Sequence, residues 1–431
     1  MEISSEESWQ NKHVYKVREQ RIPKIVNTPD SEKLREEIEP WLTALFQSEH
    51  LSLLTGSGLS TAIHWLAKEE AGAGMDKISF SDFSEQIDLA SESSAKISGR
   101  GKANIEDQIR VTNELIKGIS IYINTGNRGS QKLKKEIVQL EKELYSGLID
   151  FANNVLICEK NITTSAKTEK ASEYLMNFIV SFASRSATRE RLNIFTLNYD
   201  RVIEFGAELA GVRLIDRFVG TINPIFRSSR IEVDMHYNPP GIRGEPRYLE
   251  GVAHFTKLHG SLDWTINDNV VKRIALPFGA ADIKKYAMER DVLLIYPNAS
   301  KDRETSEYPY VELFRDYAAS VCRPNSTLVV YGYSFGDEHI NRVILDMLSI
   351  PSTHLVIISY ADEGNRINSF YQKAKRPAQI SLLVGKHFGD LKILVDNYLP
   401  KPAIDNTTFK MAELLRARGI FVKDEEISED E

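Results

Sequence analysis

Residues 195–200 end an apolar run with polar side chains whose chemistry suits a ligand site. The Asn198 amide can both donate and accept hydrogen bonds, so it can hold a ribose hydroxyl or a water molecule. Asp200 can orient its neighbours or stabilise a developing positive charge. Polar groups at the carboxyl end of a strand lie where open α/β sheets bind ligands. A second interpretation, compatible with the first, is that Asp200 caps the helix that follows.

A second candidate is His259, which is followed by glycine and serine within residues 257–264. Imidazole titrates near neutral pH and can therefore act as a general base. The pattern predicts that His259 lies where a strand passes into a loop. Because a single histidine is more often structural or exposed than catalytic, a structural role is the alternative interpretation.

Small residues form a third candidate site at Gly56, Ser57 and Gly58, between an apolar run at 51–54 and a helical segment containing Ser60. This order predicts a strand, a tight turn and a helix. Backbone N–H groups in such a turn can approach a pyrophosphate, and a helix N-terminus favours negative charge. The alternative is a tight turn that binds nothing, because short glycine-rich motifs have many false matches.

A similar arrangement recurs at residues 331–341, where Gly332 and Ser334 follow an apolar run and precede a helical segment. Glycine permits close approach of a ligand, and a serine hydroxyl can bind a ribose or a phosphate. Asp337 is a candidate N-cap, so a capped turn is the alternative. Asp362 follows the next apolar run, and we expect it to contact an adenine ribose by analogy with acidic ribose-binding residues.

A sheet must position these loops, and the sequence predicts one from short apolar runs that alternate with helical segments. Continuous β-branched runs separated by helices are typical of a buried parallel sheet. The predicted strands are residues 51–54, 192–197, 292–297, 327–333, 354–360 and 379–385. The helical segments between them include residues 61–70, 311–322 and 338–348. The predicted fold class is α/β, with a Rossmann-like parallel sheet flanked by helices.

Other regions lie outside this alternation. Residues 1–27 lack clear periodicity and are expected to form an N-terminal arm, after which Thr28 is a candidate helix N-cap. Apolar residues at helical spacing predict a large, mostly helical insertion at about 66–190, with an exposed loop at 91–101. Residues 401–431 are expected to form an amphipathic helix and an acidic tail.

The composition of the 431 residues argues against a nucleic-acid-binding protein, a zinc protein and a membrane protein. A net charge of -7 without a basic stripe argues against strong direct binding of nucleic acid. The two cysteines, Cys158 and Cys322, cannot form a four-cysteine zinc site, and their separation argues against a disulfide framework. No signal region or apolar stretch of roughly 20 residues appears. We therefore expect a cytoplasmic protein without a membrane partner or a metal.

Taken in order, the four loops resemble those of the sirtuin (silent information regulator two) family, particularly its divergent bacterial antiphage-defence branch. Residues 56–60 are similar to the family's Gly-Ala-Gly-x-Ser loop, and Asn198 and Asp200 match its Thr-x-Asn-x-Asp motif. His259 matches the histidine of the catalytic His-Gly pair. Residues 332–334 resemble the Gly-Thr-Ser loop near the adenosine side of NAD.

The resemblance implies a NAD-binding domain over residues 28–400, with NAD as the substrate and no metal. It implies that Asn198 orients the ribose and the attacking water, that His259 acts as the base, and that Asp200 supports both. The NAD-contacting residues are expected to be Gly56, Ser57, Gly58, Ser60, Thr196, Gly332, Ser334 and Asp362.

Two departures separate this chain from the deacylase sirtuins. Those enzymes carry a zinc ribbon built on four cysteines, which this chain cannot form, and residues 61–65 depart from their Gly-Ile-Pro-x-Phe-Arg continuation. The resemblance instead implies hydrolysis of the nicotinamide–ribose bond, giving nicotinamide and ADP-ribose. A NAD-dependent deacylase or ADP-ribosyltransferase, and a sensor that binds NAD or ADP-ribose without turnover, remain as alternatives.

The resemblance to the defence branch also implies partners. It predicts a NADase (NAD hydrolase) that is silent until infection and then depletes NAD. It further predicts a homo-oligomer that partners a HerA-type hexameric DNA-translocating ATPase. The insertion at 66–190 and the helix after residue 401 are the candidate contact regions, with core packing as the alternative for at least half of their apolar residues.

Overall fold

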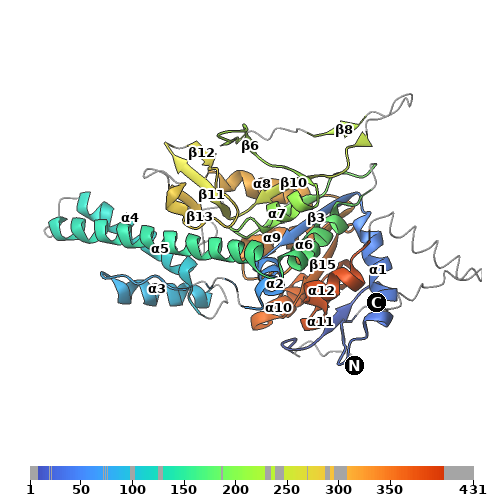
Figure 1. Ribbon diagram of the computed structural model, residues 1–431. Helices are drawn as coiled ribbons and strands as arrows, with labels where there is room; N and C mark the ends of the chain where they lie inside the picture. The colour runs from blue at the N-terminus through green and yellow to red at the C-terminus, as the bar shows by residue number, and fades with distance from the viewer. Residues whose placement is uncertain are drawn as a thin grey trace, which may run out of the picture.

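The apolar runs of the sequence form a central nine-stranded sheet in the order β2-β1-β16-β15-β14-β3-β4-β10-β5 (Figure 1). The computed structural model describes residues 8–18, 20, 22–70, 72, 74, 76–97, 102–124, 130–185, 188–228, 234–237, 247–268, 270–286, 292–295 and 308–401. Seven neighbouring strands are parallel: β3 (His50–Thr55), β4 (Asn193–Thr196), β5 (Arg213–Ile215), β10 (Val252–Lys257), β14 (Ser326–Tyr331), β15 (His354–Ser359) and β16 (Ile380–Val384). The predicted parallel sheet is confirmed.

Part of the segment expected to form an arm belongs to this sheet. Strand β1 (Val14–Lys16) pairs antiparallel with β16, and β2 (Lys24–Ile25) pairs with β1. Trp9 is buried, with its ring 5.6 Å from that of Tyr371. Strands of two and three residues are too short to give a readable periodicity, so only the pairing with β16 reveals them.

Two predicted boundaries are wrong. Helix α1 (Ser31–Phe46) begins after Asp30, whose carboxylate accepts the N–H groups of Glu32 and Lys33, and not after Thr28. The loop expected at 91–101 is helical as far as residue 97, because α3 (Ser84–Ile97) continues through a buried Ser91. Cap preference and serine content are weak local signals, and tertiary packing overrides them here.

Helices cover both faces of the sheet. On one face lie α1, α2 (Ser57–Lys68), α6 (Thr168–Ala183), α7 (Val202–Leu209), α12 (Leu391–Ile393) and the π-helical turn η5 (Leu394–Tyr398). On the other face lie α8 (Tyr310–Val321), α9 (Glu338–Leu348) and α10 (Arg366–Ala374). Adjacent strand residues divide between the two cores, as Leu53 and Leu54 do, because successive strand side chains point to opposite faces.

The winding of the chain reverses at β3. From β3 the sheet grows through β4 and β10 on one side, whereas β14, β15 and β16 lie on the other side. Ligands of open α/β sheets bind outside the carboxyl ends of the strands at such a reversal. The turn after β3 and the turn after β14 are therefore neighbours at the expected position of a ligand crevice.

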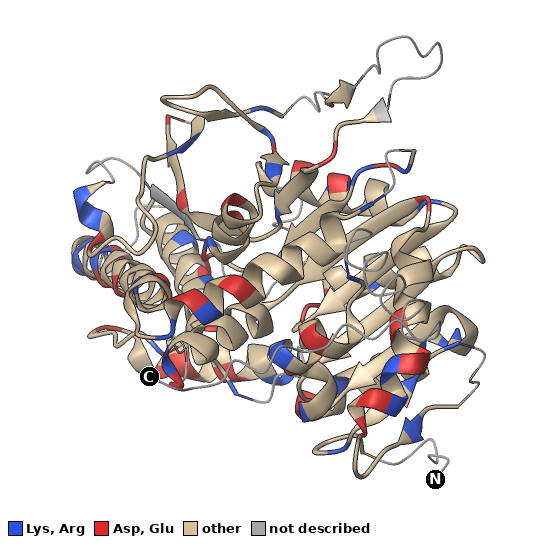
Figure 2. Ribbon diagram, turned by 45° about the vertical axis from the view of Figure 1, so that its right-hand side comes forward, with Lys and Arg blue, Asp and Glu red and all other residues tan. Residues whose placement is uncertain are grey.

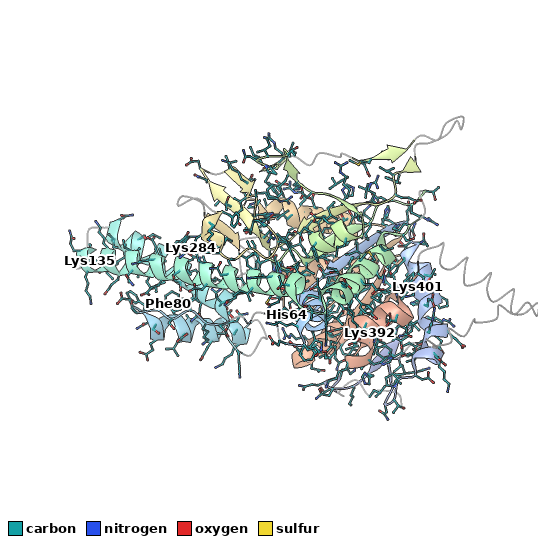
Figure 3. All side chains as sticks on the ribbon, in the orientation of Figure 1. His64, Phe80, Lys135, Lys284, Lys392 and Lys401 are labelled. Atoms are coloured by element: carbon teal, nitrogen blue, oxygen red, sulfur yellow. The ribbon has the colours of Figure 1, made fainter. Side chains whose placement is uncertain are left out.

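The insertion is helical, as predicted, and extends away from the sheet (Figure 1). Helices α3, α4 (Ile105–Asn124) and α5 (Ser130–Thr164) share a separate apolar core. Figure 3 shows Lys135 near the far end of α5 and His64 near its junction with α2. Helix α6 belongs instead to the core on the sheet.

A smaller antiparallel sheet lies beside the central one, in the order β13-β11-β12-β7-β6. Its strands are β6 (Phe218–Val219), β7 (Ile225–Phe226), β11 (Gly260–Asn267), β12 (Val270–Arg273) and β13 (Val292–Ile295), and a separate pair joins β8 (His236–Tyr237) to β9 (Arg247–Tyr248). The run at 292–297 was predicted to join the parallel sheet, which is wrong, because β13 pairs antiparallel with β11. An apolar run does not identify its partner strand.

In the part of the chain that the structure describes, the short remaining elements are α11 (Lys386–Gly389) and three 3₁₀ turns, Ile283–Lys285, Glu363–Asn365 and Pro377–Gln379. The helix and acidic tail predicted after residue 401 lie outside the described residues. No helix in the described part of the chain has the length and apolar character to span a membrane. Lysine and arginine residues lie interspersed with aspartate and glutamate residues in the view of Figure 2.

A buried ion pair joins the insertion to the sheet. The Glu159 carboxylate on α5 accepts the N–H of Arg201 at 2.9 Å, its Nε at 3.2 Å and the N–H of Gly279 at 3.0 Å. Arg201 also donates to the carbonyls of Leu276 and Pro277. Desolvation raises the pKa of Glu159, and the charge and hydrogen bonds of Arg201 oppose that shift. Three segments distant in sequence are thus fixed at one point.

Replacing Glu159 by alanine is expected to lower the free energy of unfolding by about 3–5 kcal/mol, because the Arg201 guanidinium would stay buried without its carboxylate. Urea unfolding measures the loss. The matched control is Glu114→Ala, which removes the half-exposed partner of Arg110 and should cost about 0.5 kcal/mol or less. Equal losses in the two variants would contradict the assignment.

Candidate functional site

A pocket of about 420 Å³ opens at the carboxyl ends of the strands around the reversal point. Eight of the residues predicted to form a site line it: Gly56, Ser57, Ser60, Asn198, Asp200, His259, Gly332 and Ser334. The volume lies in the range of small-molecule sites. The sequence required Asn198 and His259 to share one crevice beside residues 56–60, and the structure brings them together there.

A chain of hydrogen bonds fixes the Asn198 side chain. Its Nδ2 donates to the carbonyl of Gly56 at 3.0 Å and to the Ser60 hydroxyl at 2.9 Å. The Ser60 hydroxyl donates onward to the Asp200 carboxylate at 2.7 Å. Because both amide hydrogens are directed at protein acceptors, Asn198 offers a ligand its Oδ1, which only accepts hydrogen bonds. This orientation suits a ribose hydroxyl or a water molecule as the donor.

Asp200 both orients its neighbours and caps the helix that follows, as the sequence predicts. One carboxylate oxygen accepts the Ser60 hydroxyl, and the other accepts the N–H of Val202 at 3.0 Å in the first turn of α7. The helix therefore holds the carboxylate in place while the carboxylate holds the Ser60–Asn198 chain. Asp200 is a positioning group for Asn198 in this arrangement.

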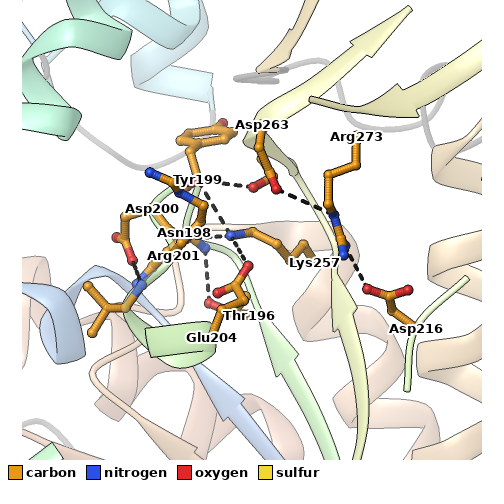
Figure 4. Close-up of polar contacts among 12 residues, drawn as sticks. Thr196, Asn198, Tyr199, Asp200, Arg201, Glu204, Asp216, Lys257, Asp263 and Arg273 are labelled. Carbon is orange, nitrogen blue, oxygen red and sulfur yellow. Dashed lines mark hydrogen bonds and ion pairs between the residues drawn. The ribbon is translucent and has the colours of Figure 1, made fainter. Parts of the chain in front are cut away.

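Strand pairing and one buried lysine place His259 beside this loop. Strand β10 pairs in parallel with β4, so Leu258 N–H donates to the Thr196 carbonyl at 2.9 Å, one residue before His259. The buried Lys257 ammonium donates to the carbonyls of Asp200 and Tyr199 (Figure 4). A lysine in a strand gives no sequence signal for this contact, which only the strand register reveals.

Charged side chains surround that lysine. Lys257 pairs with Glu204 on α7 at 3.0 Å. In Figure 4, Arg273 lies between Asp263 and Asp216, with the ion pairs at 3.3 and 2.6 Å. Opposite charges that are buried together offset their desolvation only when they are well paired. The contacts of Lys257 hold the end of β10 against the loop that carries Asn198.

His259 also contacts a second histidine. Its Nε2 lies 3.4 Å from the Nε2 of His339, the second residue of α9. The ring of Phe314 packs against His339 with centroids 4.8 Å apart. A hydrogen bond between two imidazoles requires one protonated and one unprotonated nitrogen at the contact. His339 can therefore set which nitrogen of His259 carries a proton.

The glycines of the two turns pack against each other. The N–H of Gly56 donates to the Tyr331 carbonyl at 3.1 Å, and that of Gly58 donates to the Gly332 carbonyl at 3.0 Å. These two amides are thus engaged within the protein. Ser57 is exposed, begins α2 and lines the pocket, so its hydroxyl and the helix N-terminus are the groups placed to meet a phosphate.

Three predicted residues do not line the pocket. Gly58 packs under it, and the Thr196 hydroxyl accepts the N–H of Asn198 at 3.2 Å. Asp362 is buried and accepts the N–H groups of Ile367 and Asn368 at 2.8 and 3.2 Å. Burial raises the pKa of Asp362, and these backbone hydrogen bonds oppose the shift. Asp362 therefore stabilises the start of α10 and is not brought to the pocket.

The insertion supplies a wall of the pocket that sequence reasoning missed. Glu106 on α4 and Phe151 on α5 line it together with Tyr199. Burial raises the pKa of Tyr199 well above its usual value, so the phenol stays protonated at neutral pH and donates to Glu106 at 3.4 Å. The sequence offers these helices as a candidate contact region, with core packing for at least half of their apolar residues, and nothing local in it indicates that they face the Asn198 loop.

The pocket is lined by both acidic and basic side chains. The carboxylates are Glu106, Glu159, Asp200 and Asp337, and the fixed cations are Lys102 and Arg366. Asp337 occupies the N-cap position of α9, as predicted, although its side chain makes no capping hydrogen bond. Among the described residues, no three or more histidine, cysteine, aspartate or glutamate side chains are grouped so that they could hold a metal ion, and both cysteines are free thiols.

The α/β sheet, the reversal point and the polar crevice are the features of open α/β folds that bind ligands at the carboxyl ends of their strands. A family profile described as a SIR2-like domain matches residues 192–378, which supports a sirtuin-like family and NAD-related activity. The match includes Asn198, His259 and Ser334, whereas the turn at 56–60 precedes it. No curated protein matches the chain at a significant level.

Replacing glycine by alanine is expected to lower the free energy of unfolding at Gly58, in the tight contact between the turns, and to raise it at Gly118. Gly58→Ala would place a Cβ 2.6 Å from the Gly332 Cα, so we expect a loss of about 1–3 kcal/mol in the free energy of unfolding. Gly118→Ala, at an exposed position of α4, would place a Cβ that meets nothing within 4 Å, so we expect a gain of about 0.5–1 kcal/mol. Urea unfolding of both variants checks the sign, and a gain at Gly58 would contradict the packing argument.

Proposed function

We propose that this protein is a NAD hydrolase that cleaves the bond between nicotinamide and ribose. The single observation that carries the proposal is the presence of Asn198 and His259 in one pocket at the reversal point of the sheet. The SIR2-like match to residues 192–378 supports NAD as the ligand class. The reaction converts NAD⁺ and water to nicotinamide, ADP-ribose and a proton.

The proposed mechanism follows from the bond that breaks. Nicotinamide leaves with the bonding electron pair, so the ribose carbon becomes oxocarbenium-like, as in glycoside hydrolysis. Asn198 Oδ1 accepts a hydrogen bond from the attacking water and orients it. His259 accepts the proton that the water loses. The carboxylates of Asp200 and Glu106 line the same pocket and favour the developing positive charge.

Positioning groups complete the proposed site. Ser60 and Asp200 hold the Asn198 amide in one orientation, and His339 sets the tautomer of His259. Ser57 and the N-terminus of α2 bind the pyrophosphate, and Ser334 binds the adenosine side. A fixed amide and a fixed base lower the barrier because their ordering costs nothing at the moment of reaction.

Hydrolysis is favoured over protein deacylation for two reasons. With two cysteines in the whole sequence, the four-cysteine zinc ribbon of the deacylases cannot form. Residues 61–65 also depart from the Gly-Ile-Pro-x-Phe-Arg continuation, which helps to position acyl-lysine or NAD in the deacylases. Water is then the acceptor of the ADP-ribosyl group.

The biological setting is proposed from the resemblance to the antiphage-defence branch. In that setting the protein is a cytoplasmic homo-oligomer that depletes NAD on activation and partners a HerA-type hexameric ATPase. Exposed apolar residues on the extended helices α4 and α5, namely Ile121, Tyr122 and Val138, support a contact surface there. Co-purification with such an ATPase, and its loss when these three residues are replaced by serine, would test the partnership.

The activity is tested by nicotinamide release from NAD. Asn198→Ala and His259→Ala are each expected to lower kcat/KM by a factor that corresponds to about 2–4 kcal/mol, the usual contribution of one preorganised group. His236→Ala, a histidine packed on Tyr248 in β8 outside the pocket lining, is the control and should retain activity. Chromatography of nicotinamide and ADP-ribose gives the rates, with and without a HerA-type ATPase.

The products distinguish the alternatives. Nicotinamide release that requires an acylated peptide would indicate a deacylase, and label transfer to protein would indicate an ADP-ribosyltransferase. Saturable NAD binding without nicotinamide release under either condition would indicate a sensor. Any of these results would replace the hydrolase proposal.

A further inference from the structure

A second hollow adjoins the pocket and shares one residue with it. It has a volume of about 230 Å³ and lies between α9 and α10, where both Phe335 and Phe370 form part of its lining. Arg366 lines both hollows. The Arg366 side chain therefore stands at the boundary between the proposed nucleotide pocket and this groove, which we call the α9–α10 groove.

The Arg366 guanidinium lies over Gly336 in the turn after β14. A Cβ at Gly336 would lie 2.7 Å from Arg366 Nη1 and 3.4 Å from the Ser334 hydroxyl, so these two polar atoms converge on the space above that glycine. Arg366 Nε donates to the Glu363 carbonyl at 3.0 Å. The ion pair with the Glu363 carboxylate, at 3.7 Å and with that side chain 72% exposed, is weak and leaves the guanidinium able to bind another anion.

The charges of the α9–α10 groove favour an anion. Its charged lining consists of Arg342 and Lys373, both exposed, the shared Arg366, and one carboxylate, Glu338. The guanidinium group binds phosphate with two parallel hydrogen bonds, which an ammonium cannot do. A phosphate beside Ser334 would therefore meet Arg366 first and the two exposed cations after it.

Asp362, the acidic residue that the sequence suggested for the adenine ribose, does not line the edge of the pocket where Ser334 and Arg366 lie. Dinucleotide sites that select NAD commonly use a carboxylate on the 2′-hydroxyl of the adenine ribose, whereas an arginine nearby accommodates a 2′-phosphate. Asp362 accepts the backbone amides of Ile367 and Asn368 and lies outside the pocket lining. Arg366, four residues later, lines it.

We infer that the site accepts the 2′-phosphorylated dinucleotide NADP, with Arg366 binding the 2′-phosphate and Arg342 and Lys373 adding to its affinity. This inference rests on the proposed function and extends its substrate class. The chemistry is unchanged: the nicotinamide–ribose bond breaks, water adds its oxygen to the ribose carbon, and the products are nicotinamide, ADP-ribose 2′-phosphate and a proton.

Binding of the two products tests the inference without turnover. Titration calorimetry on the full chain compares ADP-ribose 2′-phosphate with ADP-ribose. We expect the phosphorylated ligand to bind the wild-type chain at least as tightly. Arg366→Gln should weaken its binding relative to ADP-ribose by at least tenfold, because charge-assisted hydrogen bonds to a phosphate are lost. Arg366→Lys should give an intermediate ratio because it keeps the charge but not the fork.

Lys392→Gln is the matched control, because it removes one positive charge from an exposed residue of α12 outside both hollows (Figure 3). It should leave the ratio of the two affinities unchanged. In the Arg366→Gln variant the ratio of kcat/KM for NADP to that for NAD should be at least tenfold lower than in the wild-type chain.

The outcomes separate this inference from the proposed function. If ADP-ribose binds but the phosphorylated ligand binds at least tenfold more weakly, or if Arg366→Gln leaves the affinity ratio unchanged, the inference is overturned and the hydrolase proposal stands. If neither ligand binds, the nucleotide site itself is wrong and both proposals fail.

Discussion

The close contact between two glycine turns is the constraint on which the site depends. Backbone hydrogen bonds of 3.1 and 3.0 Å join the turn after β3 to the turn after β14, and a side chain on Gly58 or Gly332 would meet the other's backbone. Gly332 also has φ of +64°, which side chains disfavour. The turns meet because β3 and β14 are neighbours at the reversal point, and the pocket floor follows from that contact.

The remaining walls are held by buried charge. Lys257 binds the carbonyls behind Asn198, and the Glu159–Arg201 pair ties the insertion to the same loop. Such pairs add little net stability compared with apolar packing, but they are costly to break singly. Their effect is geometric, because each fixes segments that share no local sequence. The pocket is therefore assembled from parts of the chain more than 100 residues apart.

The architecture decides which hydrogen-bond donors and acceptors the pocket presents to a ligand. The Gly56 carbonyl and the Ser60 hydroxyl accept the two amide hydrogens of Asn198 and leave its Oδ1 as an acceptor, and the His259–His339 contact couples the protons of two imidazoles. An acceptor and a base suit the activation of water or of a ribose hydroxyl. The Arg366 guanidinium adds a cation at the edge of the same pocket. Under the proposed function, bond cleavage takes place at the end with Asn198 and His259, and phosphate binds at the end with Arg366.

The sequence by itself determined the alternation of strands and helices and the polar types at strand ends, because periodicity and residue chemistry are local properties. It therefore predicted the parallel sheet, and the resemblance of the loops predicted that Asn198 and His259 share one crevice. Only the tertiary structure decided which strands are neighbours, since an apolar run such as 292–297 fits either sheet. The same limit explains why Asp362 was expected at the pocket and Arg366 was not. Register and long-range packing, which no local pattern encodes, place one on a helix start and the other at the site.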